Sequence, residues 1–151
     1  MTKIYGSETD MALRILMLLK VHGGAVNIDR MISCDFIATY GAYFGIDEEN
    51  LHGDNEYSFG ELSVRRKTAF RAIKYLVTQD LICAADTDNG FVYRVTDGGR
   101  DIVRKMTSEY SLRYQKSMRT VLDRWGSNSD KDLRDLIDLV SRKKNNEGIE
   151  G

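Results

Sequence analysis

The chain has 151 residues, of which 42% are hydrophobic and 30% charged, so it is long and apolar enough for one domain with a core and a further segment. No apolar run reaches the length of a membrane span. The formal net charge of −1 is unlike the basic balance of most dedicated DNA-binding domains, so any affinity for DNA needs a local basic patch. The polar start lacks a signal-peptide pattern, and Cys34 and Cys83 fall in predicted apolar elements, so we expect a cytoplasmic protein with two reduced, packed cysteines.

Two apolar helices are predicted near the start of the chain. After a short flexible lead, Thr9 or Asp10 caps a helix that ends near Val21. This helix is apolar nearly all round, which predicts heavy burial. Asn27 caps a second helix over roughly 28–45.

A third helix, opening near Glu61, follows a long acidic loop over 45–58 that lacks the ligand order of an EF-hand. Its apolar residues at helical spacing are Ala69, Phe70, Ile73, Leu76 and Val77. Its basic residues are Arg65, Arg66, Lys67, Arg71 and Lys74. On a helical wheel, Lys67, Arg71 and Lys74 share the outward face, whereas Arg66 points toward the core.

A β-hairpin is predicted after the third helix. The apolar runs 81–84 and 91–95 flank a polar stretch over 86–90 that contains Asn-Gly, a strong hairpin signal. Thr96-Asp97 then supplies the N-cap chemistry for a helix that begins near Gly98. A helix, a hairpin and a helix in this order predict the second half of a winged helix-turn-helix domain.

Two amphipathic helices are predicted in the C-terminal part of the chain, over 98–125 with a kink at Ser108 or in the Glu109-Tyr110 region, and over 130–144. Their apolar stripes contain Tyr110, Tyr114, Met118, Leu122, Trp125, Leu133, Leu136, Ile137 and Val140. The predicted fold class is mainly α with a small β-hairpin. The predicted divisions are a winged helix-turn-helix domain (9–106), a C-terminal helical extension (107–144) and a disordered tail (145–151).

The sequence lacks the motifs of common enzymes and metal sites. It has two histidines, neither in a catalytic spacing, and it has no phosphate-binding glycine loop, paired-cysteine metal knuckle or Gly-x-Ser-x-Gly elbow. We therefore expect a non-enzymatic protein with no catalytic residues, no metal and no cofactor.

Nucleic-acid binding is one functional hypothesis. Its candidate contacts are Lys67, Arg71 and Lys74 on the third helix, with Arg94 in the hairpin. In a winged helix-turn-helix the recognition helix enters the major groove and the wing touches the backbone or minor groove. The same residues also fit a solvated cationic face, and an adjacent acidic loop would repel phosphate.

Protein interaction is the other hypothesis, and the C-terminal apolar stripes favour it. One small three-helix core cannot fully cover them, and tyrosine and tryptophan are enriched in interface cores. The stripe residues named above are therefore the candidate partner-binding set. The alternative is that both helices fold back on their own domain.

A buried ion pair is predicted between the second and third helices. Asp35 and Arg66 each lie in the apolar stripe of a helix, and an unpaired buried charge is very costly. We predict that they form a structural salt bridge, with Arg65 as the second candidate for the cation.

Several short motifs, taken in chain order, resemble a known family. They are Asp35 in the second helix, Glu61 and Arg65-Arg66 opening the third, Leu81-Ile82 entering the hairpin, Tyr93-x-Val95-Thr96 leaving it, and Ser108-x-Tyr110 after it. Over about residues 10–125 the chain resembles the middle component of ABC-three-component systems, the small subunit of Lamassu-type bacterial defence operons. Glu109 stands where the family pattern has a proline.

The resemblance implies a role that composition and periodicity do not show. Such subunits associate with an SMC- or Rad50-like ABC ATPase and with an effector subunit, often a nuclease, and the assembly senses invading phage or plasmid DNA. It implies a non-catalytic adaptor that bridges the ATPase and the effector, meets double-stranded DNA through the complex, and needs no membrane. The alternative is a homodimeric winged-helix transcriptional regulator whose C-terminal helices form the dimer interface.

Overall fold

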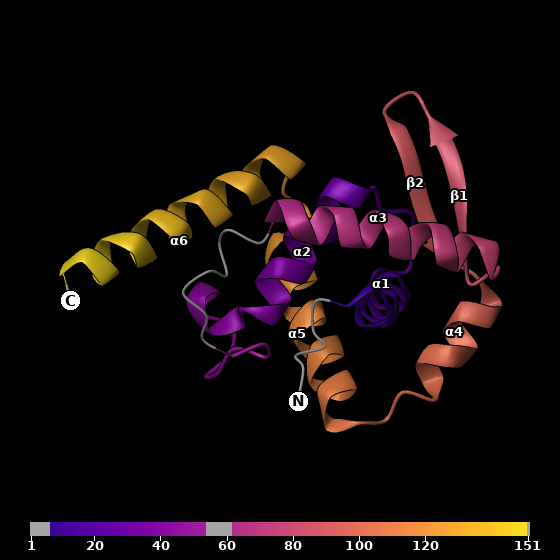
Figure 1. Ribbon diagram of the computed structural model, residues 1–151, viewed down its shortest axis with the longest axis horizontal. Coiled ribbons are helices and arrows are strands. Elements are labelled where there is room, and N and C mark those ends of the chain that lie inside the picture. The colour runs from indigo at the N-terminus through magenta and orange to yellow at the C-terminus, as the bar shows by residue number, and fades with distance from the viewer. Residues whose placement is uncertain (1–6, 54–61, 151) are drawn as a thin grey trace.

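The computed structural model describes residues 7–53 and 62–150, and it confirms a mainly helical fold with a small antiparallel hairpin (Figure 1). The elements are α1 (Glu8–His22), α2 (Ile28–Thr39), the 3₁₀ helix η1 (Gly41–Phe44), α3 (Leu62–Thr78), β1 (Ile82–Thr87), β2 (Gly90–Val95), α4 (Asp97–Arg104), α5 (Glu109–Trp125) and α6 (Asp130–Glu150). None of the described helices is both long enough and apolar enough to cross a membrane.

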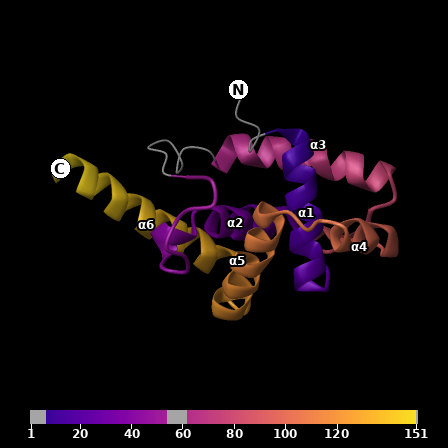
Figure 2. The ribbon, with the colours of Figure 1, turned by 90° about the horizontal axis from the view of Figure 1, so that it is seen from below.

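The helices of the body pack in three layers, with α1 and α2 in the middle layer. Helix α3 contacts one side of α1 and α2, and α5 contacts the other side of the same two helices (Figure 2). Helix α6 packs on α2 through its first turns and then extends away from the body, on the side opposite the hairpin (Figure 1). One hydrophobic core cluster therefore includes residues from the first helix to the last.

Helix α1 begins earlier than the sequence predicts. Its N-cap is Ser7, whose hydroxyl accepts a hydrogen bond from the backbone N–H of Asp10, so Thr9 is already helical. The helix ends at Gly23, which adopts a left-handed φ of 83° and donates to the carbonyl of Leu19. The predicted heavy burial is confirmed, because most of the helix lies in the core.

Helix α2 has the predicted cap but ends sooner than predicted. The side chain of Asn27 accepts from the backbone N–H of Arg30, which confirms the start. Tyr40 leaves the helical conformation, and η1 replaces the last turns of the helix predicted over 28–45. Part of the predicted acidic loop, together with the predicted helix start at Glu61, lies outside the described residues.

The hairpin confirms the predicted turn and lengthens both strands. Ile82 pairs with Val95 at its base and Thr87 pairs with Gly90 at its tip, so Asp86 and Thr87 belong to β1 rather than to the polar turn. Gly90 has a φ of 101°, a conformation that glycine adopts without strain. A backbone bridge between Val26 and Tyr93 joins the hairpin to the segment before α2.

The helix predicted over 98–125 is in fact two helices. Helix α4 ends at Arg104, and Ser108 caps α5 by accepting a hydrogen bond from the backbone N–H of Ser111. Ser108, one of the two positions expected for a kink, is therefore an N-cap, and the helix is fully broken there. Helix α6 continues to Glu150, whereas the sequence predicts a disordered tail over 145–151.

Replacing either of two adjacent glycines in α4 with alanine should change the stability of the protein, in opposite directions for the two positions. A Cβ atom on Gly99 would lie 2.2 Å from the carbonyl oxygen of Leu81 and 2.6 Å from a methyl group of Val95, so Gly99→Ala should destabilise the protein by about 1–3 kcal/mol. A Cβ atom on Gly98 meets no atom closer than 3.7 Å, and alanine favours the helix by up to about 1 kcal/mol. Urea unfolding of the two variants measures both effects. Equal midpoints would contradict the close approach of α4 to the chain before β1.

Candidate functional site

A charged cluster lies at the centre of the helical body. The Oδ1 atom of Asp35 accepts hydrogen bonds from Arg14 Nε at 2.9 Å and from the Tyr114 hydroxyl at 2.7 Å. Its Oδ2 atom accepts from Arg65 Nη1 at 3.0 Å and from Arg14 Nη2 at 3.3 Å. All four side chains are buried, and they come from α1, α2, α3 and α5. One carboxylate therefore connects four helices.

The predicted pairing of Asp35 with Arg66 is wrong, and the second candidate, Arg65, is the partner in α3. Arg66 is exposed and bonds to Asp29 at 3.0 Å. Successive side chains are rotated by about 100° around a helix axis, and the buried face of α3 contains Arg65 rather than Arg66. Sequence reasoning also missed Arg14, although a single cation within the apolar run of α1 was a signal that it needed a buried anion.

The surroundings of Asp35 keep its carboxylate ionised. Burial alone would raise the pKa of Asp35, but the charges of Arg14 and Arg65 and the hydrogen bonds from Arg14 and Tyr114 keep that pKa well below its ordinary value. Burial and the adjacent Asp35 raise the pKa of Tyr114 well above its ordinary value, so its hydroxyl remains a donor. Asp35 is thus ionised and fully engaged, which suits a structural connection between helices.

The candidate partner-binding stripes of the C-terminal helices face the chain's own core. Tyr114, Met118, Leu133 and Ile137 are buried, and Tyr110, Leu122, Trp125, Leu136 and Val140 are partly buried and packed against the core. Trp125 meets the edge of the Phe44 ring, with centroids 6.5 Å apart. At the start of α6, Asp130 bonds to Arg30 at 2.8 Å. The described contacts are those of helices folded back on their own domain.

The candidate nucleic-acid contacts do not share one surface. Lys67, Arg71 and Lys74 are exposed on α3, as predicted. Arg94 pairs with Cys83 in the hairpin, and the alternation of side chains places it on the opposite face from Tyr93, which faces α3. The hairpin cation therefore lies apart from the cations of α3.

The outward face of α3 also carries large apolar side chains, which corrects the predicted core face of this helix. Phe70 is 47% exposed and Val77 is 38% exposed. The core side of α3 is formed instead by Ala69, Ala72, Ile73 and Leu76. Phe70 and Val77 are seven residues apart, so they line up on a second face of the same helix.

This second face of α3 forms one wall of a groove of about 490 Å³, and the hairpin forms the other. We call it the α3–hairpin groove, and it is lined by Phe70, Ile73, Lys74, Val77, Thr78, Ala84, Phe91 and Tyr93. An adjoining hollow of about 470 Å³ shares Phe70 and is lined further by Ser63, Arg66, Lys67 and Arg71. The two hollows together follow α3 along most of its length.

Comparison with known proteins bears directly on function. A family model described as "ABC-three component (ABC-3C) system Middle Component 2" matches residues 4–147. The chain belongs to this family. It is thus a middle component of an ABC-ATPase-associated system, as the motifs of the sequence suggested. No curated protein and no solved structure matched the chain.

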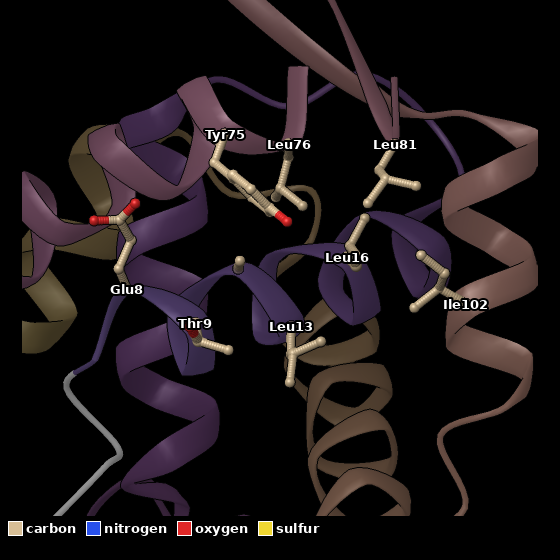
Figure 3. Close-up of a pocket in the computed structure, with 9 residues that line it drawn as sticks. Glu8, Thr9, Leu13, Leu16, Tyr75, Leu76, Leu81 and Ile102 are labelled. Atoms are coloured by element: carbon tan, nitrogen blue, oxygen red, sulfur yellow. The ribbon is translucent and has the colours of Figure 1, made fainter. Parts of the chain in front are cut away.

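A second apolar pocket of this middle component lies between α1 and α3. It has a volume of about 580 Å³ and is lined by Glu8, Thr9, Ala12, Leu13, Leu16, Tyr75, Leu76, Leu81 and Ile102. In Figure 3, Tyr75 and Leu76 point from α3 toward α1, with Glu8 at one end and Ile102 at the other. Such a lining suits an apolar side chain rather than a reacting group.

The described cysteine thiols of the middle component differ in burial, and the described acidic side chains form no metal site. Among the side chains described in residues 7–53 and 62–144, no three of His, Cys, Asp or Glu come together as metal ligands. Burial raises the pKa of Cys34 to about 11, which confirms it as a packing residue. Cys83 is exposed on β1, so its predicted burial is wrong. Because β1 is exposed on both faces beyond Ile82, a short apolar run did not imply burial there.

Proposed function

We propose that this middle component is a non-catalytic winged-helix adaptor in a Lamassu-type antiphage or anti-plasmid complex, where it bridges an SMC- or Rad50-like ABC ATPase and an effector subunit. The observation that carries the proposal is the family match over nearly the whole chain, because it names a component of a three-part ABC system. The effector is of the nuclease class, and double-stranded DNA is met by the assembled complex.

The fold supports this role in two ways. The order of α2, α3, the hairpin and α4 supports the proposed winged-helix assignment. The cluster around Asp35 joins four helices through buried, charge-assisted hydrogen bonds, and such bonds favour a rigid body. An adaptor that holds two partners in a set geometry needs a rigid body of this kind.

The alternative of a dimeric regulator has less support. It requires the apolar stripes of α5 and α6 to be available to a second copy. Tyr114, Met118, Leu133 and Ile137 are instead buried within the chain. An exposed apolar surface on α3 is the more accessible place for a partner.

Pairwise co-expression tests the bridging role. The tagged middle component should retain the ABC ATPase in one experiment and the third component in another, and all three should elute as one complex. Without the middle component, the ATPase and the third component should separate on size exclusion. If those two form the complex without it, the bridge is contradicted.

A further inference from the structure

The α3–hairpin groove combines exposed apolar side chains with a concave shape. Phe91 is 56% exposed on the hairpin wall, opposite Phe70 and Val77 on the α3 wall. Ile73 and Tyr93, both buried, lie at the base. Each exposed ring leaves apolar area in water that a partner can cover, which favours binding.

The charged residues that α3 itself contributes beside this groove are all basic. From residue 62 to residue 78 the helix contains five basic residues and no acidic residue. Arg65 is buried with Asp35, whereas at the surface Arg66 pairs with Asp29 and Arg71 lies 3.8 Å from Glu8. Lys67 and Lys74 are exposed as well. Lys74 Nζ lies 5.0 Å from the centre of the Phe70 ring, so positive charge stands directly beside the apolar wall.

These features match an amphipathic helix with acidic flanks. The lining residues of α3 include positions 63, 67, 70, 74 and 77, which have the spacing with which two helices pack side by side. The 15 residues from 63 to 77 extend over about 21 Å in a helix, so about four turns of a partner helix fit along them. We propose that the α3–hairpin groove binds an acidic amphipathic helix of a partner protein, an inference that rests on the adaptor function proposed above.

The same surface is poorly suited to double-stranded DNA. Phosphate contacts supply most of the affinity of non-specific DNA binding, and Phe70, Val77 and Phe91 offer none. Asp86 and Asp88 stand at the tip of the hairpin, where a wing that touches phosphate would carry cations. Arg94 lies on the hairpin face away from the groove. Acidic residues of the partner helix would therefore lie on the α3 side and its apolar residues between the two walls.

Assembly of the three co-expressed components provides the first test. Phe70→Glu and Phe91→Glu place like charge in the path of the acidic helix, and each should reduce the retained partner by at least about tenfold. Leu139→Glu is the matched control, because Leu139 on α6 has the same 56% exposure as Phe91 but lies outside the groove. Unchanged melting temperatures of all three variants show that folding is intact.

Photocrosslinking identifies the occupant. A benzophenone amino acid at position 70 should form a covalent adduct with one segment of the ATPase or third component. That segment, read by mass spectrometry after nuclease treatment, should be helical in pattern and rich in Asp and Glu. Adducts with DNA, with a basic segment or with a second copy of this chain would each overturn the proposal.

Two failures are distinguishable. If the wild-type chain retains neither component, the adaptor function fails and the docking proposal falls with it. If the wild-type complex forms and the Phe70→Glu and Phe91→Glu variants assemble like Leu139→Glu, the adaptor function stands and the groove is not its docking site.

Discussion

Replacing Asp35 with asparagine should lower the free energy of unfolding by about 3–5 kcal/mol at neutral pH, because two buried arginines would lose their anion. For a chain of this size, that loss corresponds to a fall in melting temperature of about 10 °C. Asparagine has nearly the same shape, so the change removes charge without opening a cavity. Thermal and urea unfolding measure the effect, and a loss below about 1 kcal/mol would show that the cluster does not stabilise the fold.

The two arginine variants are internal controls for the charge argument. Arg14→Met leaves Asp35 bonded to Arg65, and Arg65→Met leaves it bonded to Arg14. Each single change therefore keeps the carboxylate paired, and we expect each to cost less than Asp35→Asn. A larger loss in either arginine variant would mean that packing of the long side chain, not pairing of the carboxylate, dominates.

The stability that Asp35 contributes should decrease as the pH falls. The pKa of Asp35 in the folded protein lies below its ordinary value, so the folded state binds the proton less readily than the unfolded chain. The extra stability is fully present above about pH 4, the ordinary range of an aspartate pKa, and is lost as the pH falls through the folded-state pKa. The stabilities of wild type and Asp35→Asn should therefore converge on acidification. A constant difference between them would contradict the lowered pKa.

Leu133→Ala should be the second large effect, with a loss of about 2–5 kcal/mol in the free energy of unfolding. Leu133 is fully buried in the core beneath the first turns of α6, so alanine leaves a cavity. Leu139, six residues further along the same helix, is 56% exposed, and Leu139→Ala should change stability by less than about 0.5 kcal/mol. Urea unfolding of the isolated chain compares them directly.

The same pair also tests the role that the sequence predicts for the C-terminal stripe. If Leu133→Ala left the isolated chain as stable as wild type but prevented co-purification of the other components, Leu133 would bind a partner rather than its own core. Destabilisation of the isolated chain would show that α6 belongs to the folded body.

Local chemistry made several elements predictable. Asn27 caps α2 because its side chain accepts a hydrogen bond from a backbone N–H of the first turn. The donor, Arg30, is only three positions further along the chain. The Asn-Gly pair marked the hairpin because glycine accepts the positive φ found at Gly90. The family motifs were likewise readable in order, and the matched family agrees with them.

The side of α3 that faces the core was not predictable from periodicity. Arg65 and Arg66 are adjacent, and an error of 100° in the rotation of α3 exchanges the buried cation for the exposed one. Phe70 was placed in the core for the same reason, although the core side of α3 is filled by smaller side chains. Helix rotation is set by packing against α1 and α2, which a single helix does not encode.

The sequence by itself determined the helical content, the hairpin, the need of Asp35 for a cation and the family, because each depends on short stretches of chain. Only the tertiary structure decided that Arg14 and Arg65 share that carboxylate, that α5 and α6 bury their stripes within the body, and that Phe70 faces a groove. These outcomes depend on which helix faces which. Burial depends on which elements pack against each other. An apolar stripe has the same sequence pattern whether it packs against its own chain or against another subunit.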